Sequence, residues 1–367
     1  MSPERDPLAG RIPVTLITGF LGSGKTTLIS KLVKHPEMNR VAVIINEIGE
    51  IGIDHDLVTL SSENISLLAN GCICCSVRTD MQETLRELFS QRRAGLMIDF
   101  DRVIIETTGL ADPAPVIQTL VSDTLLSAQF RLDGVVTLVD AFNGLGLLDH
   151  QAEAIKQIAL ADRLFITKDD LVDAAKLTKL QERLEDINPQ AAIALLNYGE
   201  IQPSVLMNIG LASARASAAT LAFLGEQYLG KSHLSSRARL DGTNGARRRV
   251  SPHDPAITTV SLRFEAPFSW TSFSSALELL ATLRGPDLLR VKGIVNVDGQ
   301  AVVVQGVQHI FHPPVTLDRW PSADRNTRLV FITRNITAES IRSLFHAVGA
   351  ITQKPSDGEP LQLSSDQ

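Results

Sequence analysis

Short apolar runs alternate with amphipathic segments through the first two thirds of the chain. An apolar run bounded by polar residues predicts a buried strand, and an apolar position at every third or fourth residue predicts a helix. The expected strands are 11–18, 41–46, 65–68, 103–105, 134–140, 163–167 and 191–197, and the expected helices are 26–35, 80–92, 115–125, 151–159 and 174–187. This alternation is typical of an α/β fold, in which helices cover both faces of a parallel sheet.

The pattern changes after residue 230. Residues 231–255 are polar, rich in Gly, Ser and Arg and without periodicity, which predicts a linker. A smaller α+β domain is expected beyond it, with strands 257–265, 289–297, 301–305, 308–311 and 329–333 and helices 272–283 and 338–348. The predicted domains are therefore 11–230 and 256–350, with disordered tails at 1–10 and 351–367.

The composition argues against several classes of protein. A net charge of −6 and an aromatic content of 5% disfavour a nucleic-acid-binding surface. No apolar run is long enough to span a bilayer, and residues 1–10 are charged and lack the apolar region of a secretory signal. We therefore expect a cytoplasmic protein that binds neither nucleic acid nor membrane.

The segment Gly19 to Thr27, GFLGSGKTT, fits the phosphate-binding pattern G-x-x-x-x-G-K-[ST] and lies between an expected strand and an expected helix. Its glycines allow a tight turn whose backbone N–H groups point at the phosphates. Lys25 is expected to contact the β- and γ-phosphates, and Thr26 to offer its hydroxyl to Mg²⁺. The alternative is a glycine-rich turn without a ligand. The predicted phosphate-binding residues are Gly19, Phe20, Leu21, Gly22, Ser23, Gly24, Lys25, Thr26 and Thr27.

Hydrolysis of a nucleotide requires further groups beside the phosphates. The apolar strand VIIE ends at Glu106, which is expected to hold Mg²⁺ through water or to orient the attacking water. Gly109 follows three residues later and is placed to donate its backbone N–H to the γ-phosphate. The segment ETTG resembles the D-x-x-G element of GTPases. Lys25, Glu106 and Gly109 are therefore the predicted catalytic residues, although a solvent-facing strand end is an alternative for Glu106.

The loop after the strand 163–167 is expected to select the base. Thr167, Lys168 and Asp170 resemble the guanine-reading pattern N-K-x-D, with Thr in place of Asn. Asp170 can accept hydrogen bonds from N1–H and the exocyclic amine of guanine, and the Lys168 stem can cover the base. The Thr167 hydroxyl would substitute in part for the missing amide. The alternative is an acidic helix start at Asp169 and Asp170.

All three cysteines, Cys72, Cys74 and Cys75, lie within four residues, which argues against a disulfide framework. Thiolates are soft ligands that suit Zn²⁺, Cu(I) and related ions. A tetrahedral site would need a further ligand, for which Glu47, His55 and water are candidates. Buried inert cysteines and a redox pair remain alternatives.

Together these motifs resemble the CobW-type P-loop GTPases, regarded as metallochaperones of the SIMIBI class. The resemblance rests on GFLGSGKTT, RVAVIINEIGEIGID, NGCICCSVR, VIIETTGLADPAP and LDGVVTLVDA, and continues into LLRVKGIVNVDGQAVVVQGVQHIF. It implies a P-loop NTPase sheet followed by a CobW C-terminal α+β domain. It also implies that Glu47 lies in the nucleotide-sensing segment, and that Cys72, Cys74 and Cys75 hold a transferable metal.

The resemblance implies a protein that hydrolyses GTP and couples this to delivery of a transition metal, zinc before cobalt, to a client protein engaged through the second domain. Alternatives are a GTPase assisting cobalt insertion, in cobalamin synthesis or nitrile hydratase activation, and a GTP-dependent regulator with little hydrolysis. The linker lacks the His-rich tract of some relatives. His309 and His312 are expected to be exposed surface histidines rather than an accessory metal site.

Overall fold

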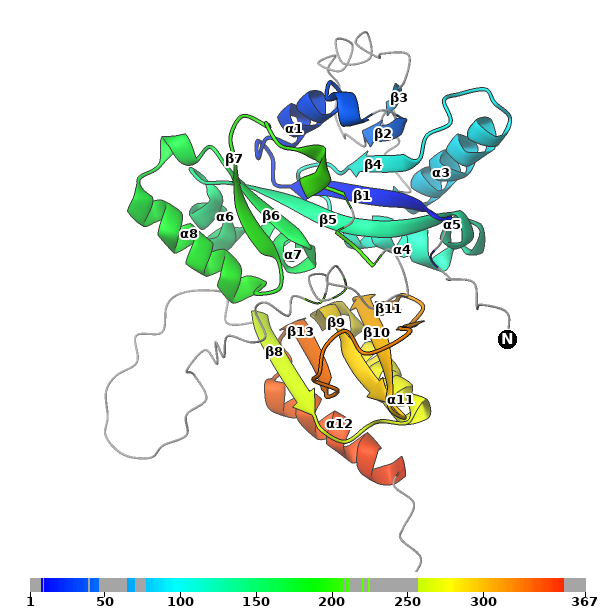
Figure 1. Ribbon diagram of the computed structural model, residues 1–367. Coiled ribbons are helices and arrows are strands. Elements are labelled where there is room, and N and C mark those ends of the chain that lie inside the picture. The colour runs from blue at the N-terminus through cyan, green and yellow to red at the C-terminus, as the bar shows by residue number, and fades with distance from the viewer. Residues whose placement is uncertain are drawn as a thin grey trace, which may run out of the picture.

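The computed structural model contains two sheets, the first built from strands within residues 12–196 and the second from strands within residues 257–334 (Figure 1). It describes residues 8, 10–38, 40–45, 65–69, 77–207, 209–211, 220, 224 and 257–352. Among these residues, no helix is long and apolar enough to cross a membrane. The predicted linker, 231–255, lies outside the described residues.

The first sheet has seven strands in the order β3-β2-β4-β1-β5-β6-β7, and every pair is parallel. The strands are β1 (Ile12–Gly19), β2 (Val41–Ile45), β3 (Ile65–Ala69), β4 (Arg102–Glu106), β5 (Phe130–Asp140), β6 (Arg163–Thr167) and β7 (Ala192–Leu196). Because the strands are parallel, the carboxyl ends of β1, β4, β5 and β6 meet at one edge of the sheet, where ligands bind in open α/β folds.

Helices cover both faces of this sheet, as the apolar runs predict. They are α1 (Lys25–Leu32), α3 (Val77–Arg93), α4 (Ala114–Ser122), α5 (Thr124–Gln129), α6 (Gly144–His150), α7 (Ala152–Leu160) and α8 (Ala174–Ile187). Successive strand residues point to opposite faces. On β1, Leu16 packs with α3 and α4, whereas Ile17 packs with α1. On β5, Val139 packs with α7 and α8.

The second sheet is antiparallel, with the order β11-β10-β9-β13-β8 and with β12 paired to β10. Its strands are β8 (Ile257–Phe264), β9 (Leu288–Val297), β10 (Gln300–Val307), β11 (Ile310–Phe311), β12 (Val315–Thr316) and β13 (Thr327–Arg334). Helices α11 (Trp270–Arg284) and α12 (Ala338–Thr352) pack on one face around Phe273, Phe331 and Phe345. The predicted P-loop α/β fold with a smaller α+β part is therefore confirmed.

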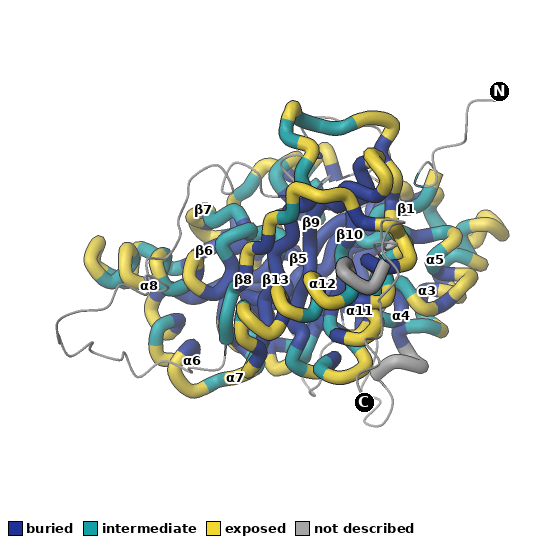
Figure 2. The backbone as a smooth tube through the Cα atoms, turned by 90° about the horizontal axis from the view of Figure 1, so that it is seen from below, coloured by how far each residue is buried: buried dark blue, intermediate teal, exposed yellow. Residues whose placement is uncertain are grey.

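The other face of the second sheet packs against the helices of the first. Val307 belongs to the apolar cluster around α3 and α4, and Leu289 and Ile332 belong to the cluster around α7 and α8. The Thr259 hydroxyl also donates to the carbonyl of Ile187, at 3.0 Å. Figure 2 shows the strands β5, β9 and β10 largely buried beneath the surrounding helices. The two sheets thus share a continuous interior.

Three expectations about elements are wrong. The expected helix 115–125 is two helices, because Asp123 has an extended backbone and its carboxylate accepts hydrogen bonds from the N–H groups of Leu125 and Leu126. An N-cap of this kind starts a new helix. The expected strand 308–311 is only β11, because Gln308 has a positive φ of 55°. The predicted tail from residue 351 begins too early, because α12 continues to Thr352.

Candidate functional site

The phosphate-binding loop, Gly19–Thr27, connects β1 to α1 at the carboxyl edge of the first sheet. Gly19, Gly22 and Gly24 have positive φ angles of 141°, 73° and 95°. Gly19 must be glycine, because a Cβ there would lie 2.4 Å from the carbonyl oxygen of Leu138. The loop then enters α1, whose first backbone N–H groups favour an anion. The sequence expectation of a strand, a glycine-rich turn and a helix matches this geometry.

Lys25 and Thr26 open α1 beside the end of β4. The Lys25 Nζ donates to the carbonyls of Gly19, at 2.9 Å, and Phe20, at 3.3 Å, so the charge lies over the loop. The Thr26 hydroxyl donates to Oε1 of Glu106, at 3.3 Å. Glu106 is fully buried. A hydroxyl and a carboxylate at this position are hard oxygen ligands, and the donor set therefore fits Mg²⁺.

The loop after β4 lies directly against the phosphate-binding loop. Thr107 fixes its start, because the Thr107 N–H donates to the carbonyl of Ile17 and the Thr107 hydroxyl donates to the hydroxyl of Thr18. A Cβ at Gly109 would lie 2.6 Å from the backbone nitrogen of Leu21. Only glycine permits this approach. Glu106 and Gly109 are therefore brought against the loop that contains Lys25 and Thr26.

The residues expected to read the base lie at the end of β6 and just after it, and Thr167 contacts the phosphate-binding loop. The Thr167 hydroxyl donates to the carbonyl of Ser23, at 2.9 Å, so Thr167 connects the two loops as the missing Asn was expected to do. Lys168 has a positive φ of 56°, and its Nζ lies 2.7 Å from Oδ2 of Asp140. Burial tends to raise the pKa of Asp140, but the hydrogen bonds from Lys168 and Asn143 outweigh it and hold that pKa below its usual value.

Asp170 is exposed at the far end of this site. It lies in a short 3-10 turn, Asp169–Leu171, so the alternative of an acidic helix start also describes its local structure. The Tyr198 hydroxyl donates to Oδ2 of Asp170, at 3.2 Å. This hydrogen bond and the charge of Asp170 raise the pKa of Tyr198. The next residue, Gly199, packs against the backbone of Thr27, which brings the loop after β7 to the phosphate-binding loop.

The predicted metal ligands cannot be placed in the same way. Glu47, His55, Cys72, Cys74 and Cys75 lie outside the described residues. Within the part of the chain that the structure describes, no group of three or more His, Cys, Asp or Glu side chains is arranged to hold a metal ion. The cysteine site therefore stays a prediction.

The expectation for His309 and His312 is half right. His309 is exposed, as expected. His312 is not an exposed surface histidine, because it lies partly buried between the two sheets near Arg290 and Asp162. Its burial, with the positive charge of Arg290, lowers the pKa of His312 to about 4.

Three residues of the site were missed from the sequence. Asp140 ends the apolar strand GVVTLVD, and an acid in that position is a usable signal. Tyr198 precedes a glycine after β7, which is a weaker signal. Gln157 is buried on α7, and its Nε2 donates to the carbonyls of Gly109, at 3.2 Å, and Ala111, at 3.0 Å. Nothing in the periodicity of its helix distinguishes Gln157 from a surface glutamine.

Two protein families match this chain. Residues 13–194 match the family CobW/HypB/UreG, nucleotide-binding domain, and residues 257–349 match the cobalamin synthesis protein CobW C-terminal domain. The first match spans β1 to β7, and the second spans the second sheet and its two helices. The order of the two matches is the order that the motifs predict.

Several relatives are similar over nearly the whole chain. The zinc chaperone YjiA of Escherichia coli (strain K12) is 33% identical over 91% of this chain and 98% of its own length. The zinc-regulated GTPase metalloprotein activator 1 of Schizosaccharomyces pombe is 29% identical over 91% of this chain and 85% of its own length. The crystal structure of the Zn(II)-bound YjiA GTPase from E. coli superposes with a TM-score of 0.67 at 28% identity, covering 92% and 99% of the two chains. The family expected from the motifs is confirmed, and the chain belongs to the CobW/HypB/UreG family.

Proposed function

We propose that this chain, a GTPase of the CobW family, couples hydrolysis of GTP to GDP and phosphate to the binding and delivery of zinc. The observation that carries the proposal is the convergence of Glu106 and Gly109 on the phosphate-binding loop, where Glu106 accepts a hydrogen bond from Thr26 and Gly109 lies against Leu21. A glycine-rich cradle would bind phosphates by itself. A buried carboxylate and a glycine backbone beside it are what hydrolysis additionally requires.

The residues divide the work between binding and hydrolysis. The backbone of Gly22 to Thr27 holds the phosphates, and Lys25 balances their charge. Thr26 and Glu106 would hold Mg²⁺, which when bound neutralises charge on the β- and γ-phosphates. Glu106 also orients the attacking water, and the Gly109 N–H donates to the γ-phosphate. Because oriented donors cost no reorganisation during the reaction, they stabilise the transition state.

The base is selected at the opposite end of the site. Asp170 accepts hydrogen bonds from guanine N1–H and from the exocyclic amine, and adenine has no matching donors. Lys168, held by Asp140 at 2.7 Å, covers the face of the base with its stem. Thr167 ties this loop to the phosphate-binding loop through Ser23. GTP rather than ATP is therefore the proposed substrate.

The zinc part of the proposal rests on the sequence and on the relatives. Cys72, Cys74 and Cys75 supply soft thiolate ligands, with Glu47 as a further ligand, and Zn²⁺ is the cargo that they hold. Two relatives similar over most of the chain are named for zinc. A cytoplasmic location would keep these thiols reduced. Zinc is therefore preferred to cobalt for this chain.

The nucleotide would control the metal through the segments that join the two sites. The loop Glu47–Asp56 and the cysteine loop lie in sequence between β2 and β4, whose carboxyl ends flank the phosphates. Contacts to the γ-phosphate order such loops, and hydrolysis releases them. Loss of GTP would then open the metal site and release zinc to a client. The second domain, residues 256–350, is the proposed surface for that client.

The test is phosphate release by the purified protein, measured with GTP or ATP and with or without Zn²⁺. We expect release from GTP that exceeds release from ATP, and a Glu106→Gln variant that binds GTP but releases phosphate about a hundredfold more slowly. Equal rates with the two nucleotides would contradict the assignment of guanine. Unchanged release in Glu106→Gln would remove Glu106 from the reaction.

A further inference from the structure

Helix α7 contacts the loop that carries Gly109 through the side chain of Gln157. The Gln157 side chain is 1% exposed, and its Nε2 donates to the carbonyls of Gly109 and Ala111. One amide therefore uses both of its N–H groups on one short loop. The backbone carbonyl of Gln157 in turn accepts a hydrogen bond from the Thr137 hydroxyl of β5, at 2.9 Å.

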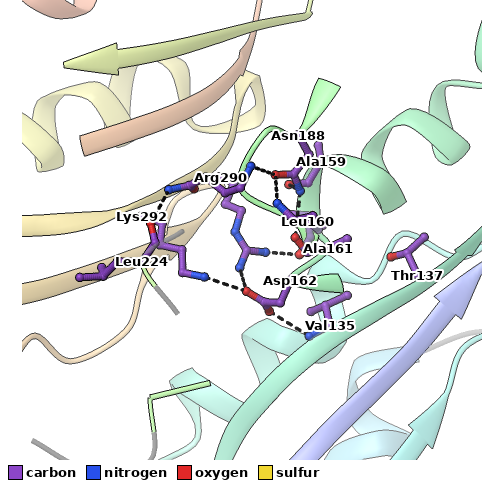
Figure 3. A network of polar contacts seen from close by, with 12 residues as sticks. Val135, Thr137, Ala159, Leu160, Ala161, Asp162, Asn188, Leu224, Arg290 and Lys292 are labelled. Carbon is purple, nitrogen blue, oxygen red and sulfur yellow. Dashed lines mark hydrogen bonds and ion pairs between the residues drawn. The ribbon is translucent and has the colours of Figure 1, made fainter. Parts of the chain in front are cut away.

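The last turn of the same helix is held by the second sheet (Figure 3). Arg290 on β9 donates to the carbonyl of Leu160, where α7 ends, and to Oδ1 of Asp162. Lys292, on the same face of β9, donates to Asp162 at 3.1 Å. The side chains of these three charged residues are at most 7% exposed. Separating buried charges from their partners is strongly destabilising, because each charge would be left without compensation in the interior. Displacement of this contact is therefore unfavourable.

Burial and the neighbouring charges shift the pKa values of two groups in this contact. Burial tends to raise the pKa of Asp162, but the charges of Arg290 and Lys292 outweigh it and keep that pKa below its usual value. Burial lowers the pKa of Lys292 to about 8. The other oxygen of Asp162 accepts the N–H of Val135 on β5, at 2.9 Å. Asp162 therefore joins the first sheet to the second through ionic hydrogen bonds.

Asn188 also binds the carboxyl end of α7. It is fully buried at the end of α8, and its Nδ2 donates to the carbonyls of Ile158 and Ala161, both at 2.8 Å. The carbonyls of the last turn are thus satisfied by side chains from α8 and from β9. Gln157 and Leu160 lie only three residues apart, less than one helical turn. The contacts of Leu160 with Arg290 and of Gln157 with the Gly109 loop therefore lie within one turn of the same helix.

We propose that α7 positions the Gly109 loop for GTP hydrolysis, with Gln157 as a positioning residue and with Arg290 of the second sheet fixing the other end of the helix. This inference rests on the proposed GTP hydrolysis, and it gives a residue of the second sheet a part in positioning the Gly109 loop. Gln157 does not touch the nucleotide; it sets where the Gly109 N–H points. A misplacement of about 1 Å at such a donor costs about a hundredfold in rate.

The experiment compares four variants of the full chain: Gln157→Met, Arg290→Lys, the double variant, and Arg284→Met. Gln157→Met keeps the length of the side chain and removes both hydrogen bonds. Arg290→Lys keeps the charge beside Asp162 and removes the planar guanidinium, which reaches Leu160 and Asp162 at the same time. Arg284 is the matched control, because its ion pair with Asp287 lies within the second half of the chain. The measurements are kcat for GTP and the affinities for GDP and for GTPγS.

We expect kcat to fall about tenfold to a hundredfold in Gln157→Met. In Arg290→Lys we expect a fall of about two- to tenfold. The double variant should be no slower than Gln157→Met, because both changes act through one helix. Affinity for GTPγS should fall in these variants while affinity for GDP is unchanged, because the Gly109 N–H faces only the γ-phosphate. Arg284→Met should match the wild-type chain.

Three results would overturn the inference. Equal losses of affinity for GDP and GTPγS would show that Gln157 only supports the fold. Wild-type kcat in Gln157→Met and Arg290→Lys would show that the helix does not position the loop, while leaving the proposed function standing. Absence of GTP hydrolysis by the wild-type chain would instead overturn the proposed function and this inference with it. If Gln157→Met fails to fold, Arg290→Lys decides the outcome alone.

Discussion

The two sheets differ in where they place their polar side chains. In the first sheet the polar residues of the site, such as Glu106, Asp140 and Thr167, lie at the ends of their strands. In the second sheet Arg290 and Lys292 lie in the middle of a fully buried strand and point at the first sheet. Strand ends leave polar atoms near ligands, whereas charges within a strand must find partners in the protein. The first sheet therefore carries the chemistry, and the second holds part of it in place.

The largest effect should come from breaking the cradle of the first sheet. Lys25→Ala removes the charge that lies over Gly19 and Phe20, and we expect GTP affinity to fall about a thousandfold because the phosphates lose their compensating cation. Isothermal titration with GTP measures it. Lys31→Ala is the control, because Lys31 lies on the surface of the same helix and pairs there with Glu200 of the segment after β7. Retained affinity in Lys25→Ala would remove this loop from the nucleotide site.

The second prediction concerns the base. Asp170→Asn replaces one acceptor oxygen with a donor NH₂, which matches xanthine in place of guanine. We expect the preference for GTP over XTP to reverse, with GTP affinity falling about a hundredfold. Competition binding with the two nucleotides measures this. Asp173→Asn is the matched control, because Asp173 only caps α8 and Asn caps a helix equally well. An unchanged preference in Asp170→Asn would place base recognition elsewhere.

A smaller effect should appear where the two sheets meet. In the folded chain the pKa of His312 is about 4, whereas in the unfolded chain it is about 6.5. Between these two pH values His312 is therefore protonated in the unfolded chain and neutral in the folded chain. Stability from His312 is thus fully present above about pH 6.5 and is lost as the pH falls toward 4. Between pH 8 and pH 5 the free energy of unfolding should fall in both chains. In His312→Gln this fall should be smaller than in the wild-type chain by up to about 2 kcal/mol. Urea unfolding at both pH values measures it, and parallel curves would refute the buried position of His312.

The parts of the site that sequence predicts are those determined locally. The phosphate-binding loop, Glu106 at the end of β4 and Thr167 at the end of β6 each follow from a motif and the strand beside it. The contact between Asp162 and Lys292 joins residues 130 positions apart and depends on how the sheets dock. Its only local signal is the pair of charges in the strand LLRVKGIVNV, which an apolar strand does not ordinarily contain.

The same distinction between local and long-range signals explains why the helix 115–125 was predicted wrongly and why Gln157 was missed. A single helix over 115–125 satisfies the apolar spacing, but Asp123 interrupts it by capping the next helix and by pairing with Arg86, which lies far away in sequence. Gln157 is a second example. Its role depends on the Gly109 loop, which reaches it only after the sheet has formed. Periodicity reports burial of apolar residues and contains no information about the partners of a buried amide.

The most direct test of the account is the Zn²⁺ affinity of the full chain, measured by competition with a chelating dye in the presence of GTPγS or GDP. If the nucleotide controls the metal, zinc should bind at least about tenfold more tightly with GTPγS than with GDP. A Cys74→Ser variant should lose this tight binding with both nucleotides. Equal zinc affinities in the two nucleotide states would contradict the coupling, because a ligand that binds two states equally shifts neither.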